Sequence, residues 1–343
     1  MVAAVWGALY AAVEVTWAVT GTTVQWKEHS AYAPGVQLFL AALAFLAGGA
    51  CLASTRTLAG LGRVAVAAAL IVALPVFVVG TNGLPIYFVT IATLSGIESA
   101  TGLAQVLLNT AGAALLLLVG LSYHRRLRGD CPRCGRPHAG AADGPLAHPA
   151  ASRAPRRTRV AVYLLMLGLL PWAGAKTIWT LGGHALGVAG DDWQRTTSVG
   201  ASGPSKATAA AGIDVTVLAA MAGIFLLLGL LHAWGQVFPR WTLFLSGRRV
   251  PRLLPLIPAW LTGIPLTMYG AALLIMAPLM AAGVLPEIEP SPPFTTSSGI
   301  TWFAEFGGLA FAGLGIGLIV AARSYAARTR PICASATATE GPT

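Results

Sequence analysis

Charged residues are scarce in this chain of 343 residues, where Asp, Glu, Lys and Arg together make up only 10%. Soluble domains carry about 25% charged residues, so a chain this poor in charge cannot cover a water-facing surface. Lysine is nearly absent and occurs only at Lys27, Lys176 and Lys206. The chain is instead 56% hydrophobic, with a mean hydropathy of +0.71, which excludes an ordinary soluble protein and predicts a membrane protein.

The common nucleotide-binding and hydrolase motifs are also missing. The sequence contains no Walker A motif, no G-x-G-x-x-G, no G-x-S-x-G and no H-E-x-x-H. No paired acidic motif of the kind that holds Mg²⁺ and a diphosphate lies on a predicted cytoplasmic helix end. These absences argue against an ATPase, a dinucleotide enzyme, a serine hydrolase and an aspartate-rich prenyl-diphosphate enzyme. The sequence contains no complete catalytic or cofactor motif, which favours a function other than catalysis.

Long apolar stretches are abundant, and a bilayer is spanned by about 20 mostly apolar residues. The first stretch carries Glu14 and lacks a basic leader, which predicts a transmembrane helix and not a cleaved signal peptide. One further stretch, Leu84–Leu94, is too short to span and is predicted to be interfacial or re-entrant. We therefore predict an all-α integral membrane protein with eight transmembrane helices: Val2–Thr20, Gly35–Ser54, Arg63–Thr81, Thr101–Tyr123, Val160–Leu181, Ile213–Trp234, Leu253–Gly283 and Ile300–Ala322.

The basic residues predict the orientation. With alternating connections, 18 of the 22 Lys and Arg residues fall on one side, which the positive-inside rule assigns to the cytoplasm. Both termini are then cytoplasmic, in a multi-pass protein of the cell membrane. This asymmetry explains the net charge of +10 without a nucleic-acid partner. The clusters at Arg125–Arg128 and Arg153–Arg159 are expected to contact anionic lipid headgroups.

A loop rich in Pro, Ala, Gly and Arg divides the chain. We predict a membrane half at 1–123, a cytoplasmic loop at 124–159, a second membrane half at 160–322 and a disordered tail at 323–343. Each half would hold four helices in the same orientation, as in a parallel internal repeat. Three positions in the first helix of each half agree with such a 4+4 repeat, because Ala11, Trp17 and Gly21 align with Ala173, Trp179 and Gly183.

Ionisable residues inside the apolar stretches are the first candidates for function, because a charge there costs about 2.5–3.5 kcal/mol or more. The repeat alignment places Glu14 and Lys176 at equivalent positions, where they could form an ion pair. The functional interpretation is a ligand or coupling-ion site in the outer half of the bundle, and the structural one is a buried pair with interfacial residues. The candidate ligand-binding residues are Glu14, Lys176, Glu305, Gln105, Trp17 and Trp179, with Asn109 beside them.

The sharpest motif is Cys131-Pro-Arg-Cys134-Gly, a CPxCG knuckle typical of zinc ribbons and rubredoxin-like sites. A structural zinc needs four ligands, and one knuckle supplies two. His138, His148 or His124 could complete the site, or two chains of a homodimer could supply four cysteines. The predicted metal ligands are thus Cys131, Cys134 and His138, with zinc as the metal. The alternative is a lone knuckle with free thiols.

Three further features of the sequence predict local structure. The segment around Pro171 predicts a kink or an interruption of the fifth helix. The pair Asp191-Asp192 has no spaced partner carboxylate and is expected to be solvated in an outer loop. A stripe of small residues on the eighth helix predicts a helix-packing face; it contains Ala304, Gly308, Ala312, Gly313, Gly315 and Gly317.

Three functional hypotheses follow, in this order. The first is binding or transport of a small solute through a site near Glu14 and Lys176. The second is a regulatory or scaffold protein whose CPxCG loop binds a metal or a partner. The third is an intramembrane enzyme that acts on a lipid or isoprenoid, with Glu14 or Glu305 as the general acid.

Overall fold

The computed structural model describes residues 1–27, 30–56, 58–92, 97, 99–129, 131, 146–199, 215–286 and 289–333. Within this part, seven helices are long and apolar enough to cross a membrane. The chain is therefore an all-α multi-pass membrane protein, whereas its orientation in the membrane stays a prediction. The helices are α1 Val2–Thr20, α2 Pro34–Ala53, α3 Leu61–Val79, α5 Ala100–Leu127, the pair α6 Arg156–Met166 and α7 Leu169–Thr180, α11 Leu253–Ala281 and α12 Ser297–Arg328.

The predicted sixth span is present as α10, Val215–Leu231, whose 17 described residues are fewer than in the seven longer helices. The short stretch after α3 forms α4, Leu84–Ala92. Helices α5 and α12 extend further than hydrophobicity predicts, mostly at their C-terminal ends, which reach Leu127 and Arg328. Polar capping residues set where the two helices begin. The Ser99 hydroxyl accepts from Gly102 N at 3.0 Å, and the Thr296 hydroxyl accepts from Gly299 N at 3.2 Å.

The predicted interruption of the fifth helix occurs between α6 and α7, at Leu167–Gly168. Pro171 explains the position, because it has no N–H for the carbonyl four residues earlier, which belongs to Leu167. The chain there makes tighter bonds instead, from Gly168 N to Leu165 O and from Leu170 N to Leu167 O. A Cβ atom at Gly168 would lie 2.5 Å from Leu309 O, so the interruption also allows close contact with α12.

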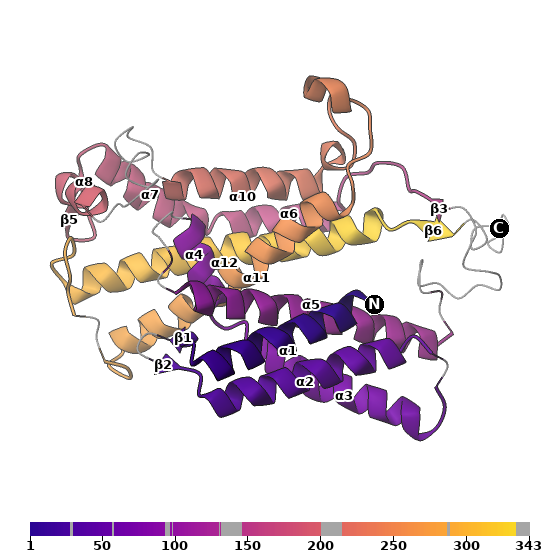
Figure 1. Ribbon diagram of the computed structural model, residues 1–343. Coiled ribbons are helices and arrows are strands. Elements are labelled where there is room, and N and C mark those ends of the chain that lie inside the picture. Colours follow the sequence, from indigo (N-terminus) through magenta and orange to yellow (C-terminus); the bar gives the residue numbers. More distant parts are fainter. Residues whose placement is uncertain are drawn as a thin grey trace. The chain divides into compact units, whose positions relative to one another are not determined.

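The chain divides into two compact units. The first contains Met1–Tyr87, Ile97–Ala147 and Pro331–Thr343, and the second contains Phe88–Gly96 and His148–Arg330. In the first unit α1, α2, α3 and α5 run side by side (Figure 1). Its closest contact joins α1 to α2, where a Cβ atom at Gly7 would lie 2.5 Å from Ala44 O and 3.0 Å from Gly48 Cα. Small residues allow this approach, as is typical of membrane helices.

In the second unit α12 contacts α6, α7, α10 and α11 (Figure 1). The predicted packing face is confirmed, because its glycines lie against neighbouring backbones. Gly308 and Ala312 face Gly270 of α11, Gly315 faces Thr267, and Gly313 faces Leu165 of α6. The helix packing of the two units thus differs. In the first unit the main contact joins α1 to α2, whereas in the second α12 contacts α6, α7, α10 and α11. The 4+4 repeat stays a prediction.

Arginines hold one end of the second unit together. Arg328 donates to Leu230 O at 2.6 Å and to Ser152 O, and Arg252 donates to Ala326 O at 2.8 Å. These bonds satisfy carbonyls that a helix end leaves without partners. Positive groups lie close together at this end. Burial lowers the pKa of Arg252, and the nearby charge of Arg330 lowers it further. The expected contact of arginine clusters with anionic headgroups remains a prediction.

Three short antiparallel ladders complete the described fold. Strand β1 (Gln25–Lys27) pairs with β2 (Ser30–Ala31), β4 (His184–Ala185) with β5 (Val188–Ala189), and β3 (Leu146–Ala147) with β6 (Ile332–Cys333). Two segments differ from the sequence expectation. The predicted tail continues α12 to Arg328 and then forms β6, and the outer loop that holds Asp191 forms a helix, α8, at Gly190–Val199.

Candidate functional site

Four polar side chains meet in the interior of the first unit. We call Tyr10 and Glu14 of α1 with Gln105 and Asn109 of α5 the Glu14 cluster. Gln105 Nε2 donates to Glu14 Oε1 at 2.5 Å and to the Tyr10 hydroxyl at 2.8 Å. The Tyr10 hydroxyl donates to Asn109 Oδ1 at 2.9 Å, and Asn109 Nδ2 donates to Gly80 O at 3.2 Å. A continuous hydrogen-bonded chain therefore runs from the end of α3 to the Glu14 carboxyl.

The spacing of these residues explains how they meet. Tyr10 and Glu14 are four residues apart on α1, and Gln105 and Asn109 are four apart on α5, so each pair occupies one face of its helix. Packing of α1 against α5 then joins the two polar faces. All four side chains are buried, and Glu14 is 0% exposed.

Aromatic rings close the cluster on one side. Trp6 and Tyr10 contact Phe77 of α3 edge-on, with ring centroids 4.9 and 5.2 Å apart. The Trp6 indole donates to Leu108 O at 3.0 Å and its ring packs on Gly112. These contacts exclude lipid and water from the polar groups, and a low local dielectric strengthens their hydrogen bonds.

Two oxygens of the cluster have no hydrogen-bond partner within the described residues, Glu14 Oε2 and Gln105 Oε1. A third such atom is the Nε2 of Gln37 on α2, whose side chain is 2% exposed. The register that sets Gly7 against Ala44 also sets Glu14 level with Gln37, seven residues further along each antiparallel helix. Buried polar groups are normally paired, so this concentration of unpaired atoms makes the region the candidate site of the first unit.

Tyr32 lies between β2 and α2 and is under the electrostatic influence of the same carboxyl. Burial, and then the negative charge of Glu14, raise the pKa of the Tyr32 hydroxyl. Tyr32 therefore stays a neutral hydroxyl at every physiological pH.

The second unit holds Lys176 and Trp179 in an aromatic cluster. The Lys176 ammonium lies 4.5 Å from the ring centroid of Trp193 and 5.4 Å from that of Trp172. Trp179 stacks on Trp193 with centroids 4.3 Å apart and an interplanar angle of 15°, and its indole donates to Ala185 O at 3.1 Å. Phe294 and Phe303 complete the cluster. Lys176 is thus stabilised by aromatic faces of its own unit.

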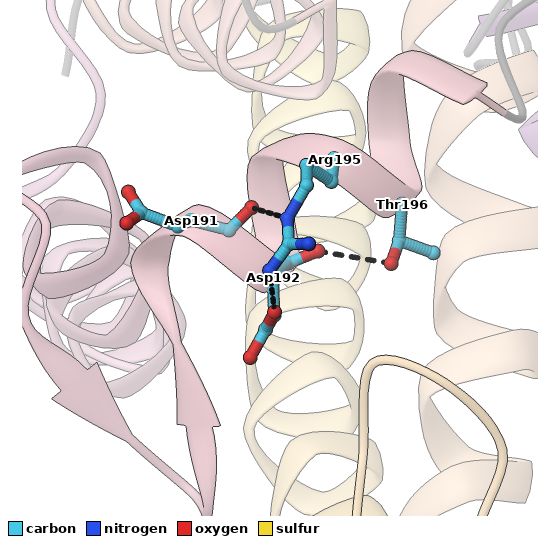
Figure 2. A network of polar contacts seen from close by, with 4 residues as sticks. All are labelled: Asp191, Asp192, Arg195 and Thr196. Atoms are coloured by element: carbon cyan, nitrogen blue, oxygen red, sulfur yellow. Dashed lines mark hydrogen bonds and ion pairs between the residues drawn. The ribbon is translucent and has the colours of Figure 1, made fainter.

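Helix α8 positions Trp193, and its polar face is shown in Figure 2. Asp192 pairs with Arg195 one turn along the helix, and the Thr196 hydroxyl donates to Asp192 O at 2.9 Å (Figure 2). The Arg195 and Asp192 side chains are 76% and 50% exposed. The solvated character expected for the acidic pair is confirmed, although the segment is helical.

Glu305 lines a pocket between the end of α11 and the start of α12. Its volume is about 430 Å³, which is within the range of small-molecule sites. Ser297, Ser298, Thr301 and Trp302 also line this pocket. Trp17 is half-buried on α1.

The predicted ligand-binding residues therefore fall into separate places. The structure joins Glu14, Gln105 and Asn109 in the first unit, whereas Lys176 with Trp179 and the pocket of Glu305 belong to the second. Glu14 and Lys176 belong to different units, and the ion pair between them stays a prediction. Of the predicted metal ligands, Cys131 is described, whereas Cys134 and His138 lie outside the described residues. Within the described part, no group of three or more His, Cys, Asp or Glu residues could hold a metal.

The sequence analysis did not identify three residues of these sites as candidates. Gln37 carries the same signal as Gln105, a polar side chain inside an apolar stretch, and could have been found by it. Tyr10 and Trp193 carry no such signal, because aromatic residues are common in membrane helices and at their ends.

Fold and site together define a multi-pass helical membrane protein with a buried carboxyl inside one helical bundle. Comparisons with protein-family models, with curated proteins and with solved structures find no match to this chain.

Proposed function

We propose that this membrane protein binds a small monovalent cation, the proton included, at Glu14, and that this site serves the binding or transport of a small solute. The proposal rests on one observation: the Glu14 carboxyl is fully buried in a membrane-spanning helix and one of its oxygens has no partner among the described residues. A carboxylate costs free energy inside a membrane, and such residues generally face ion or substrate pathways.

The surrounding groups support a cation as the ligand. Glu14 Oε2 and the nearby Gln105 Oε1 are both acceptors without partners in the described part of the chain, so the complementary ligand is a donor or a positive charge. Glu14 is the only carboxyl in the described part of the first unit, which favours binding of one cation over acid–base catalysis by a pair of carboxyls.

The pocket beside Glu305 is our candidate for the solute. A carboxyl, three hydroxyls and an indole in a volume of about 430 Å³ suit a small polar molecule with a positive or hydrogen-bond-donating group. Cation binding at Glu14 does not depend on this assignment.

The test is a cation titration of the purified protein in lipid nanodiscs. Sodium, potassium, ammonium and choline chlorides are compared at constant ionic strength, and Tm is recorded for each, together with its dependence on pH. We expect a saturable rise in Tm for one of the small cations or for the proton, but not for choline, which is too large. A ligand at 100 times its Kd stabilises the folded state by about 2.7 kcal/mol.

Two variants make the test specific. Glu14→Gln keeps the shape and removes the charge, so it should fold and lose the response. Glu289→Gln makes the same chemical change at an exposed carboxyl and should keep it. An unchanged response in Glu14→Gln, or a response to choline equal to the others, would show that Glu14 is a structural residue.

A further inference from the structure

The end of the chain folds back onto the central loop. Strand β6, directly after α12, pairs with β3, so that Cys333 lies opposite Leu146. The Sγ atoms of Cys131 and Cys333 lie 3.9 Å apart, although the two residues are 202 positions apart in the sequence. Both cysteines are buried, at 8% and 0% exposure, with Ile332 packed against them.

The distance between the two sulfurs can be compared with the geometry of a disulfide and of a zinc site. Sulfurs joined in a disulfide lie about 2.05 Å apart, so these two are not bonded. Two thiolates on one tetrahedral zinc, each with a Zn–S bond of about 2.3 Å, lie about 3.8 Å apart. The distance of 3.9 Å, which is also within reach of an S–H···S hydrogen bond, therefore fits two ligands of the same zinc ion.

We propose that Cys333 is a ligand of a zinc site that also contains the CPxCG knuckle, so that the site has three thiolates, Cys131, Cys134 and Cys333. Cys134 lies outside the described residues, and its place in the site rests on the knuckle spacing alone. His138, four residues after Cys134, is the proposed fourth ligand, which makes a Cys₃His set. The C-terminal cysteine supplies the thiolate that one knuckle lacks.

Basic residues lie close to both cysteines in the sequence. Arg125, Arg126 and Arg128 precede Cys131, and Arg330 precedes Cys333 by three residues. Only the thiolate binds zinc, and these positive charges would offset the negative charge that several thiolates bring to one ion. Zinc binding then releases the thiol protons and contributes free energy to folding.

Both described cysteines belong to the first unit and lie in segments close to its boundaries in the sequence. Strand β3 ends at Ala147, directly before the second unit begins at His148, and β6 begins one residue after the chain re-enters the first unit at Pro331. A zinc ion on Cys131 and Cys333 would fix these two crossing segments to each other. Its role is structural or regulatory, and it does not depend on cation binding at Glu14.

Metal analysis of the purified protein tests the proposal. The protein is produced in zinc-supplemented medium without a polyhistidine tag, and zinc per chain is measured by plasma mass spectrometry. We expect about one zinc per chain in the wild type and its loss in Cys131→Ser and in Cys333→Ser. Cys51→Ser, which changes a buried cysteine of α2, should keep the metal.

A second measurement uses the folded wild-type protein, in case a variant fails to fold. Mercurial modification should release the zinc in step with about three thiols per ion, and cobalt in place of zinc should show thiolate-to-metal absorption. Full zinc content in folded Cys333→Ser, or a wild type that takes up no zinc, would overturn the proposal. An intact mass lower by two hydrogens, restored by reductant, would replace it with a Cys131–Cys333 disulfide.

Discussion

Gln105 on α5 donates from one nitrogen to both Glu14 and Tyr10 of α1, at 2.5 and 2.8 Å. This amide therefore connects the carboxyl of the first unit to the chain of Tyr10, Asn109 and Gly80. The position of the carboxyl and the packing of α1 on α5 depend on the same side chain.

Replacing Gln105 by Leu should destabilise the protein, because it leaves the buried Glu14 carboxyl and the Tyr10 hydroxyl without their donor. An unsatisfied buried group costs about 1–3 kcal/mol, and more when charged. Thermal unfolding in nanodiscs measures the loss. The double variant with Glu14→Leu should lose less than the sum of the two single variants, because the groups interact. Strict additivity would contradict the contact. Leu107→Ala, at an exposed position of α5, should have little effect.

Gly7→Ala should weaken the contact of α1 with α2, because the added methyl would overlap Ala44 O. Overpacking of this kind costs about 1–3 kcal/mol. Gly49→Ala is the matched control, since a Cβ atom there meets nothing within 4 Å. The control should be neutral or slightly stabilising, because alanine favours a helix over glycine. Equal Tm values for the two variants would contradict the close approach.

Trp193→Ala should destabilise the aromatic cluster of the second unit, because it removes the stack on Trp179 and one aromatic face from the Lys176 ammonium. Truncation of a packed tryptophan costs about 3–5 kcal/mol. Trp302→Ala, which truncates a side chain that is 57% exposed, should cost much less. Chemical unfolding followed by circular dichroism compares the two variants, and a smaller loss for Trp193→Ala than for Trp302→Ala would refute the role of the stack.

Arg328→Met should lower Tm, because Leu230 O loses its donor, Ser152 O keeps only the bond from Gln236 Nε2, and the guanidinium no longer lies over the Tyr325 ring. The expected loss is about 1–3 kcal/mol. Arg328→Lys should restore only part of it, since a single ammonium does not reproduce the planar fork of arginine. Arg323→Met on the exposed face of the same helix is the control. If both methionine variants unfold at the same temperature, the carbonyl contacts contribute nothing.

The helices were largely predictable from the sequence, because a membrane span needs a long apolar stretch whatever lies around it. Errors occurred where local chemistry opposes composition. Hydroxyl caps set the first residues of α5 and α12 in polar sequence ahead of the apolar stretch. The polar segment around Asp192, expected to be a loop, forms α8, which packs on Trp179. The interruption near Pro171 was predictable, because proline acts on the carbonyl four residues earlier in the same helix.

The candidate site was predictable only in part. The cost of a polar group in hydrocarbon singled out Glu14, Gln105 and Asn109, and the structure joins these three. Trp193 and Cys333 could not be found in this way, because their importance comes from partners distant in the sequence.

The sequence by itself determined that this chain is a helical membrane protein, where its helices lie and which polar residues its membrane segments contain. Those properties follow from transfer free energies, which each segment has on its own. Only the tertiary structure decided that Gln105 donates to Glu14, that Lys176 contacts aromatic rings and that Cys333 lies beside Cys131. Such contacts depend on the register of packed helices and the return of the chain end, which no single segment specifies.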